Sequence, residues 1–389
     1  MRILQVSSLF KPHIGGVEKH VDMLSRMLVQ DGHEVTVYTS NIPHSKKHEY
    51  INGINIFRFN CLASPLNNQI TPGIFFKLLN KHYDILHVHS HVHLSSNLAV
   101  LSKKFNKNPI VLTSHGVSNF QDKKAIIENI YNRTIAKWMF SNVDRIIALT
   151  HSQAEILKLL GANQKSIVVI PNGIDLTRIG ISNGVGTCDN NLIISKLSSH
   201  VHFKIIKNRK ILLYVGSLIP RKGVNYLIES MKYIYPDVVL LIVGGSLKRN
   251  YNFENALKSR VRSLGLNNIL FLGQVSNEDL GYLYTIADIF ILPSLSEGLP
   301  CTLIEAMSYK KCVIATKIAG NYDVIHNWQN GVLVNPRDPI DIADKINFIL
   351  DHDHLKETLG QAARKEIELN YNIEKVYKST LNVYEDCLK

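Results

Sequence analysis

Short, continuous runs of valine, isoleucine and leucine recur along the chain, separated by segments with helical spacing. A strand that is apolar at nearly every residue must be covered on both faces, which is typical of parallel strands with helices on either side. Because the runs fall into two series, the sequence predicts two doubly wound α/β domains. The first series lies near residues 2–6, 34–40, 84–89, 109–115, 145–150 and 166–173, and the second near residues 210–217, 238–245, 268–275, 288–294, 312–316 and 331–336.

The length of the chain also indicates two domains, since 389 residues exceed what one ordinary core holds. We expect an N-terminal Rossmann-like domain over residues 1–176 and a second Rossmann-like domain over residues 209–365. Residues 177–208, rich in Gly, Asn and Ser, are expected to link them. Residues 366–389 are expected to form a helix that packs back on the N-terminal domain.

The net charge indicates which classes of partner to expect, and the cysteine content indicates the cellular compartment. The 44 Lys and Arg residues against 32 Asp and Glu leave a net charge of +12, which favours anionic partners such as a phosphorylated substrate or an acidic membrane surface. Nucleic-acid binding is not expected, because the basic residues are dispersed and no recognition motif occurs. The 5 cysteines form no CxxC pair, and no apolar run is long enough to span a membrane. We expect a cytoplasmic protein and leave open peripheral attachment to the cytoplasmic face of the membrane.

The segment SEGLPCTLIEAM, residues 296–307, places one carboxylate in a loop and another in the helix that follows. The loop follows a strand of the second series, at the edge where doubly wound sheets bind ligands. Pro300 suits the first position of a helix, whose free N–H groups attract anions. Glu297 would lie at the mouth of that site, and Glu305 about one and a half turns inside the helix. The pair suits a diphosphate that joins a sugar to a ribose, although a loop carboxylate and a solvated helix carboxylate would show the same pattern.

Two further loops contain groups that suit a phosphate ligand. Gly15 and Gly16 lie between the first strand and the first helix, where glycines let backbone N–H groups approach phosphate oxygens. This pair is not GxGxxG, so the nicotinamide or flavin fingerprint is missing there. Arg221 and Lys222 follow the first strand of the second domain and could offset the charge of a departing diphosphate. Each motif alone also fits an ordinary glycine turn or a solvated basic turn.

Together with the segments 170–175, 287–294 and 330–338, these motifs resemble the retaining GT-B glycosyltransferases of family GT4. The resemblance extends from Gly15 to about Asp338, and its most specific motif is Glu-x7-Glu, with EGLP before the helix and EAM at its end. It implies two Rossmann-like domains that face each other across a cleft, with the acceptor on the N-terminal domain and the nucleotide sugar on the C-terminal domain. It also implies transfer of a sugar, with retention of configuration, from a nucleoside diphosphate sugar to a hydroxyl acceptor.

The resemblance implies roles for individual residues. Glu305 would bind the ribose hydroxyls, Glu297 would contact the donor sugar beside its reacting carbon, and Gly16 would donate a backbone N–H to the phosphate from across the cleft. His115 matches the family's histidine near the reacting sugar. The implied catalytic residues are Glu297, His115, Lys222 and Arg221. The implied donor-binding residues are Gly15, Gly16, Ser217, Arg221, Lys222, Gly298, Leu299 and Glu305.

Three positions depart from the family pattern. Ser217 stands where the family often has Arg, so Arg221 beside Lys222 is expected to supply the second charge. Lys310 and Cys312 stand where the family usually has Gly and Pro, which puts the shape of that turn in doubt. The family's Gly-Gly before an acidic residue becomes AGNYD, residues 319–323, which leaves a role for its aspartate open.

The sequence leaves the substrates open. We expect a hexosyltransferase with a UDP-sugar as donor, or GDP-mannose as second choice, and a sugar, lipid-linked or cell-envelope glycan as acceptor. The resemblance implies no metal and no cofactor. Two other classes stay open: a sugar-nucleotide epimerase of similar build, which would turn over its donor without an acceptor, and a non-catalytic sugar-nucleotide binder.

Two features lie outside the resemblance. Four histidines occupy alternate positions and would share one strand face, which could bind Zn²⁺ or consist of satisfied core histidines: His87, His89, His91 and His93. Residues 121–140 predict a basic amphipathic helix that could lie on an anionic membrane or pack on the core with a solvated basic face. This helix carries Lys123, Lys124, Arg133, Lys137 and Trp138.

Overall fold

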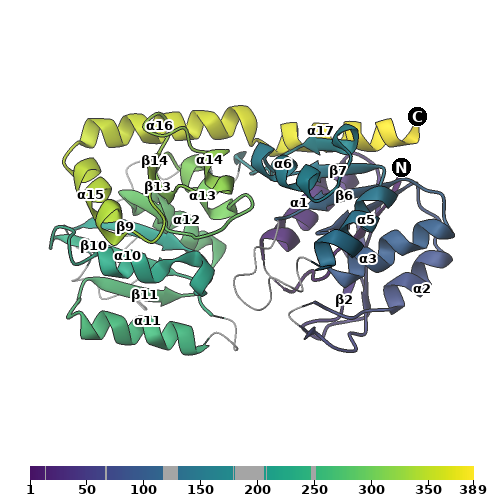
Figure 1. Ribbon diagram of the computed structural model, residues 1–389, viewed down its shortest axis with the longest axis horizontal. Coiled ribbons are helices and arrows are strands. Elements are labelled where there is room, and N and C mark those ends of the chain that lie inside the picture. Colours follow the sequence, from purple (N-terminus) through teal and green to yellow (C-terminus); the bar gives the residue numbers. More distant parts are fainter. Residues whose placement is uncertain are drawn as a thin grey trace. The chain divides into compact units, whose positions relative to one another are not determined.

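The computed structural model describes residues 1–13, 15–65, 68–116, 130–177, 179, 206, 208–246 and 251–389. The chain divides into two compact units. The first consists of Met1–Gly173 with Glu374–Lys389, and the second of Ile174–Ile373. Each unit contains a largely parallel sheet with helices packed on it (Figure 1), which confirms the two predicted doubly wound α/β domains.

The sheet of the first unit has the strand order β3-β4-β2-β1-β5-β6-β7-β8. Neighbouring strands are parallel except β3 and β4, which are antiparallel. The chain order reverses between β1 and β5, and such a reversal marks the usual ligand-binding point of a doubly wound sheet. The strands are β1 Arg2–Val6, β2 Glu34–Ser40, β3 His48–Ile51, β4 Ile54–Phe59, β5 Ile85–His89, β6 Ile110–Ser114, β7 Arg145–Ala148 and β8 Ile167–Val169.

Helices cover both faces of this sheet. Alternate residues of a strand point to opposite faces, so Ile3 and Ile85 pack under α1 and α17, while Leu4 and Leu86 pack under α2, α3, α5 and α6. The helices are α1 Gly16–Gln30, α2 Gly73–Leu79, α3 Leu94–Leu101, α5 Lys137–Asn142, α6 His151–Leu159 and α17 Ile373–Leu388. Short helical segments occur at η2 Ser102–Lys104, η3 Asn132–Ala136 and η4 Gln164–Ser166.

The last helix, α17, belongs to the first unit although the rest of the C-terminal region belongs to the second. The Tyr377 hydroxyl donates to Asp31 at 2.6 Å, and the Tyr384 hydroxyl lies 2.6 Å from Nδ1 of His87. The predicted start of this segment, residue 366, lies within the preceding helix, α16 Asp353–Asn370.

The sheet of the second unit has the strand order β11-β10-β9-β12-β13-β14, and all neighbours are parallel. This is the Rossmann order, with its reversal between β9 and β12. The strands are β9 Lys210–Val215, β10 Val238–Val243, β11 Ile269–Gly273, β12 Ile289–Leu292, β13 Cys312–Thr316 and β14 Val332–Val334. The helices are η6 Pro220–Lys222, α10 Val224–Ser230, α11 Tyr251–Ser263, α12 Asn277–Ile286, α13 Cys301–Ser308, α14 Ala319–Tyr322, α15 Pro339–Leu350 and α16 Asp353–Asn370.

The central strands of this second sheet show why continuous apolar runs were required. In β10, Leu240 and Ile242 pack in the core under α10, α11 and α15, whereas Val239 and Leu241 are fully buried on the opposite face. Every residue of the strand therefore needs an apolar side chain, and the run VVLLIV supplies it.

The hairpin of β3 and β4 was not predicted from the sequence. Its turn is Asn52-Gly53, with φ angles of 51° and 80°, the positive values that a two-residue hairpin turn requires. Burial alternates along both strands, so neither has the continuous apolar run of a strand that is covered on both faces.

Some predictions fall on residues that the structure does not describe. The linker prediction lies almost entirely outside the described residues, as do residues 121–129 of the predicted basic helix. The remainder of that helix is helical from Ile130 to Asn142. Within the described part of the chain, no helix has both the length and the apolar composition needed to cross a membrane.

Candidate active site

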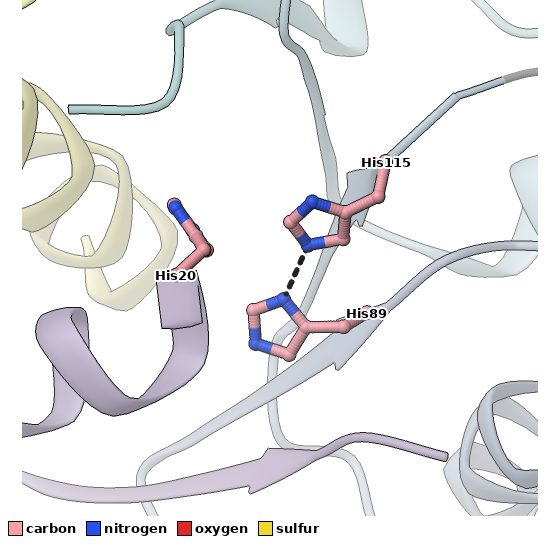
Figure 2. Close-up of side chains that lie close together, drawn as sticks. All are labelled: His20, His89 and His115. Carbon is pink, nitrogen blue, oxygen red and sulfur yellow. Dashed lines mark hydrogen bonds between the residues drawn. The ribbon is translucent and has the colours of Figure 1, made fainter. Parts of the chain in front are cut away.

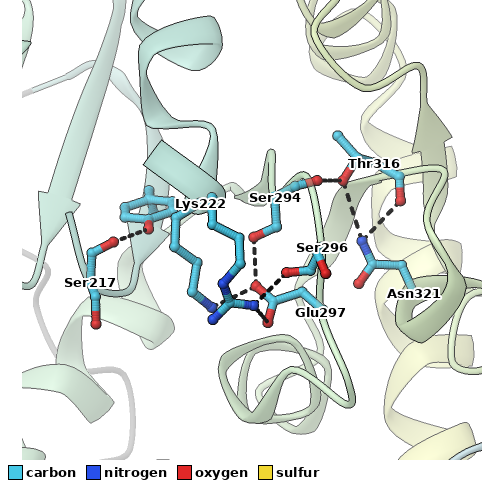
Figure 3. Close-up of polar contacts among 9 residues, drawn as sticks. Ser217, Lys222, Ser294, Ser296, Glu297, Thr316 and Asn321 are labelled. Atoms are coloured by element: carbon cyan, nitrogen blue, oxygen red, sulfur yellow. Dashed lines mark hydrogen bonds and ion pairs between the residues drawn. The ribbon is translucent and has the colours of Figure 1, made fainter. Parts of the chain in front are cut away.

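The charged residues singled out in the second unit meet at the carboxyl ends of β9 and β12, the reversal point of the sheet. Arg221 and Lys222 end the short helix η6 after β9, and Glu297 lies in the loop after β12. Figure 3 shows the side chains of Lys222 and Glu297 pointing toward each other from these two loops. The backbone N–H of Leu295 donates to the Arg221 carbonyl at 2.8 Å, which ties the loops together.

Gly223 explains how the two loops come so close. Its φ is +65°, in the left-handed region, and a Cβ atom there would lie 2.0 Å from the carbonyl oxygen of Pro293. Only glycine allows both this backbone conformation and this approach. The adjacent Lys222 is thereby held beside the end of β12.

The Glu297 carboxylate is the centre of the cluster. Nζ of Lys222 lies 2.5 Å from Oε1, the Ser294 hydroxyl donates to the same oxygen at 2.6 Å, and Nη1 of Arg221 lies 3.8 Å from Oε2. The Glu297 side chain is only 6% exposed, whereas that of Arg221 is 48% exposed. Burial alone would raise the pKa of Glu297, but the charges of Lys222 and Arg221 and the hydrogen bonds from Lys222 and Ser294 outweigh it. The pKa is lowered, so this buried carboxylate stays anionic at neutral pH.

The second carboxylate, Glu305, lies on α13 as predicted from the motif. The Tyr284 hydroxyl donates to its Oε2 at 3.0 Å, and the Tyr284 ring stacks on Tyr309 at 5.2 Å between centroids. The prediction for Pro300 was wrong by one residue. Pro300 is the N-cap, with an extended backbone of φ −75° and ψ 108°, and the helix begins at Cys301.

A third loop, between β13 and α14, supports the backbone at Gly298. A Cβ atom on Gly320, at the start of α14, would lie 2.0 Å from the Gly298 carbonyl, so only glycine fits. The Thr316 hydroxyl donates to the Ser294 carbonyl, and Asn321 in turn donates to the Thr316 carbonyl at 2.9 Å (Figure 3). The segment AGNYD, a departure from the family pattern, therefore still supplies the close backbone approach.

The structure also shows the surroundings of the other residues that depart from the family pattern, Ser217, Lys310 and Cys312. Ser217 is exposed, and its carbonyl accepts a hydrogen bond from the Tyr214 hydroxyl at 3.1 Å. Lys310 has a φ of 58°, a left-handed conformation that glycine adopts without strain. The turn after α13 is thus one that favours the family's glycine, here formed by lysine. Cys312 is buried in β13.

In the first unit, Gly15 and Gly16 lie at the start of α1, at the carboxyl end of β1. Gly15 is the N-cap and Gly16 the first helical residue. The Glu18 carboxylate folds back over Gly15, since a Cβ atom there would lie 2.3 Å from its Oε2, and it pairs with His13 at 3.4 Å. Carboxylates at this third helical position commonly cap a helix start. A phosphate at these glycines would therefore have to displace Glu18.

His115 follows β6 and lies beside two other histidines, His20 of α1 and His89 of β5 (Figure 2). Its Nε2 is 3.0 Å from Nδ1 of His89, and its ring centroid is 5.1 Å from that of His20. Burial, together with the neighbouring histidines, holds the pKa of His115 well below its usual range, so the ring is neutral. His20 was not singled out from the sequence, because its proximity depends on how α1 packs on the sheet.

The predicted row of four histidines is only half correct. His87 and His89 share a face of β5, and His87 is satisfied by Tyr384 and by Thr113 at 2.7 Å. The strand ends at His89, and Ser90 turns the chain with a φ of 69°, so His91 and His93 leave that face. His91 bonds to Ser114 at 3.1 Å, and His93 is the N-cap of α3.

Comparison with known families decides the identity of the chain. The family model described as Glycosyltransferase Family 4 matches residues 14–178, and the model described as Glycosyl transferases group 1 matches residues 197–366. The chain is a glycosyltransferase of this GT4, group 1 family. The membership of family GT4 that the Glu-x7-Glu motif indicated is thus confirmed.

Relatives and solved structures agree with this family. This chain is 27% identical in sequence to the uncharacterized glycosyltransferase MJ1607 of Methanocaldococcus jannaschii, over 99% of this chain and 98% of the relative. It is 29% identical to UDP-Gal:alpha-D-GlcNAc-diphosphoundecaprenol alpha-1,3-galactosyltransferase of Escherichia coli, over 80% and 78%.

Among solved structures, Anabaena Alr3699/HepE in complex with UDP and glucose has a TM-score of 0.80 at 19% identity, with 99% and 100% coverage. A glycosyltransferase from Rickettsia africae ESF-5 has a TM-score of 0.78 at 25% identity, with 100% and 98% coverage. These likenesses confirm the predicted GT-B fold.

Proposed function

We propose that this glycosyltransferase transfers a hexose from a nucleoside diphosphate sugar to a hydroxyl acceptor with retention of configuration, and that the donor binds to the second unit. The observation that carries this proposal is the cluster of Lys222, Arg221 and Glu297 beside the start of α13. It combines two cations with a helix N-terminus, which is the combination that binds a diphosphate.

Each charged group has a distinct part in the proposed donor site. The Arg221 guanidinium, half exposed and 3.8 Å from Glu297, can turn to a phosphate oxygen. Lys222 carries three N–H donors, so it can keep Glu297 and still donate to the diphosphate. Backbone N–H groups of Gly298 and Leu299, at the approach to α13, would complete the anion site of the second unit, and Ser217 would line the loop after β9. Stabilising the departing diphosphate in this way lowers the barrier to transfer.

Glu297 would act on the sugar through its charge. Because Lys222, Arg221 and Ser294 keep its pKa low, the carboxylate is anionic when the positive charge develops at the anomeric carbon. Glu305, held by Tyr284, would accept hydrogen bonds from the ribose hydroxyls.

Retention would follow from attack on the face that the diphosphate leaves. The bond between the anomeric carbon and the phosphate oxygen breaks, the acceptor oxygen forms the new bond, and the acceptor proton passes to the departing diphosphate. His115, neutral in its buried setting, would hydrogen-bond the reacting sugar. No metal or other cofactor takes part in this proposal, because Lys222, Arg221 and the helix start supply the positive charge.

The relatives favour particular substrates. The name of the Escherichia coli relative gives UDP-Gal as donor and a diphosphoundecaprenol-linked sugar as acceptor. The Anabaena structures contain UDP or UDP-glucose. We therefore place a UDP-sugar before GDP-mannose, and a lipid-linked or cell-envelope glycan as acceptor. A net charge of +12 suits such an anionic acceptor and peripheral binding at the cytoplasmic face of the membrane.

The test is nucleotide binding measured by calorimetry and thermal unfolding with UDP, GDP and ADP. A nucleotide at 100 times its Kd should add about 2.7 kcal/mol to the free energy of unfolding. The shift should weaken in Arg221→Gln and Glu305→Gln and persist in Arg262→Gln, a surface control on α11. If none of the three nucleotides binds the wild type, the proposed donor site is wrong.

Turnover then separates the proposed transferase from the other classes. Transfer to an added glycan acceptor supports the proposal. Donor turnover with epimer formed and no acceptor present would indicate an epimerase instead. Binding that survives Glu297→Gln, with no turnover of any donor, would indicate a non-catalytic binder.

A further inference from the structure

Three histidines from separate elements of the first unit meet in one cluster (Figure 2). One nitrogen each of His20, His89 and His115 lies within 4.8 Å of the other two. His20 and His89 are buried, and His115 is partly exposed, which leaves the cluster accessible from one side. Within the described residues this cluster consists of imidazoles, without a carboxylate or thiolate.

The surrounding hydrogen bonds fix the tautomer of His89. The amide Nε2 of Gln5 donates to the Ser25 hydroxyl at 2.8 Å, so the amide oxygen faces Nε2 of His89, also at 2.8 Å. His89 must therefore carry its proton on Nε2 and present the lone pair of Nδ1 to the cluster. An oxygen acceptor behind the ring that turns the other nitrogen inward is the usual arrangement of a metal-binding histidine.

His20 supplies a second, independent observation. Among the described residues its Nδ1 is buried without a hydrogen-bond partner. Buried polar atoms of this kind are uncommon in folded proteins, because the loss of water is not repaid by any bond. The His20 ring centroid lies 5.1 Å from that of His115 and 5.9 Å from that of His89, so the ring faces the same small space.

We propose that His20, His89 and His115 form a binding site for a divalent transition metal such as Zn²⁺. Zn²⁺ binds imidazole nitrogens at about 2.0–2.1 Å, which places the nitrogens of a tetrahedral site about 3.4 Å apart. The His89 and His115 nitrogens are already 3.0 Å apart, so most of the adjustment falls on His20. Three histidine ligands leave the fourth position to water.

Metal binding at this site needs no net loss of a proton. The metal takes the lone pair of His89 Nδ1 and replaces the hydrogen bond from His115 Nε2. The proton of His115 moves from Nε2 to Nδ1, so the ring stays neutral and offers Nε2 to the metal. Magnesium and calcium do not suit the site, because they prefer oxygen ligands.

Occupation of the site would inhibit the enzyme, and this consequence rests on the proposed function. His115 is the residue expected near the reacting sugar, and a metal on its Nε2 would hold the ring away from that role. We therefore expect Zn²⁺ to act as an inhibitor, while transfer itself proceeds without metal.

The experiment measures metal binding to the full chain in two ways. Calorimetry measures the binding of Zn²⁺, and the visible absorption spectrum measures the binding of Co²⁺. We expect one ion per chain and the intense absorption of tetrahedral Co²⁺. Loss of a residue that only orients a metal ligand lowers metal affinity about 10- to 100-fold. Because His20 is itself a proposed ligand, His20→Ala should lower the affinity for Zn²⁺ by at least this factor. His82→Ala, which removes an exposed histidine of the same unit, should leave binding unchanged.

Gln5→Met gives a variant that keeps all three ligands and loses only the amide behind His89. It should weaken Zn²⁺ binding by about 10- to 100-fold. If the wild type shows no tetrahedral Co²⁺ spectrum, or if His20→Ala binds Zn²⁺ as tightly as the wild type, the metal site is refuted. The histidines would then form only a hydrogen-bonded chain that orients His115. Nucleotide binding is measured on the second unit and would be unaffected, so failure here is distinct from failure of the donor site.

Discussion

The ion pair of Lys222 and Glu297 offers the most direct test of the arrangement at the end of β12. Lys222→Met removes the ammonium group and leaves a carboxylate that is only 6% exposed. Breaking a buried ion pair costs about 3–5 kcal/mol. Arg221 at 3.8 Å and the Ser294 hydroxyl at 2.6 Å still compensate part of the charge. We therefore expect a loss of about 2–3 kcal/mol in the free energy of unfolding, or about 5–10 °C in Tm.

A double-mutant cycle assigns this loss to the pair. Glu297→Gln in the Lys222→Met background removes the uncompensated charge and should recover about half of the loss or more. Lys258→Met is the matched control, because Lys258 is 43% exposed and its partner Glu254 lies one turn away on the same helix, α11. It should cost less than about 0.5 kcal/mol. Urea unfolding at pH 7.5 provides the measurement.

The pH dependence gives the result that would refute the reasoning. In the wild type the pKa of Glu297 is lowered, so its stabilisation is present at neutral pH and is lost only as the pH falls through that low pKa. Without Lys222, burial should raise this pKa above the unfolded value, so the cost of the substitution should shrink between pH 7.5 and pH 5. An equal cost at both pH values, or a cost below about 0.5 kcal/mol at pH 7.5, would contradict the proposed pairing.

Three further predictions concern stability. Burial lowers the pKa of His20 and His91 to about 4, so the unfolded chain takes up protons below about pH 6.5 while the folded chain does not. Urea unfolding should show that the free energy of unfolding falls by about 2 kcal/mol for each of these histidines between pH 7.5 and pH 5. No such fall would contradict the burial of His20 and His91 as neutral rings. A non-glycine residue in the left-handed conformation costs about 1–2 kcal/mol. Gly223→Ala should lower the free energy of unfolding by well over this amount, because the new Cβ also meets a carbonyl oxygen at 2.0 Å. Gly265→Ala, at nearly the same φ of +66° but with open space around it, is the control, and equal costs would exclude the steric argument. Lys310→Gly should raise Tm by about 2–4 °C through relief of its left-handed conformation, and a lower Tm would show that the lysine side chain stabilises the turn.

The strands were predictable because burial on both faces leaves a direct trace in the sequence. In β10 the residues of both faces are apolar, so the run is continuous and cannot be mistaken for a surface strand. The hairpin of β3 and β4 left a weaker trace, since burial alternates along both strands and neither has a continuous apolar run. Its Asn52-Gly53 turn was the available signal.

The candidate site was predictable only as far as topology allows. Residues that follow β9 and β12 meet because these strands are neighbours at the reversal point, so Lys222 and Glu297 could be expected together. Their partners could not be derived in this way. The hydrogen bond from Ser294 depends on the turn geometry of its loop, and the one from Tyr284 depends on how α12 packs beside α13. His20 reaches His115 only through the packing of α1 on the sheet.

The two units differ in the electrostatics of their strand ends, and this difference bears on the proposed division of the reaction. At the end of β12, opposite charges lie within 2.5 Å, and Arg221 remains half exposed, which favours an anionic ligand. At the ends of β5 and β6, the rings of His89 and His115 are held neutral by burial. The one carboxylate over the glycine turn, Glu18, would repel a phosphate there. A strongly anionic donor therefore gains more at the second unit, whereas a neutral hydroxyl acceptor suits the imidazoles of the first.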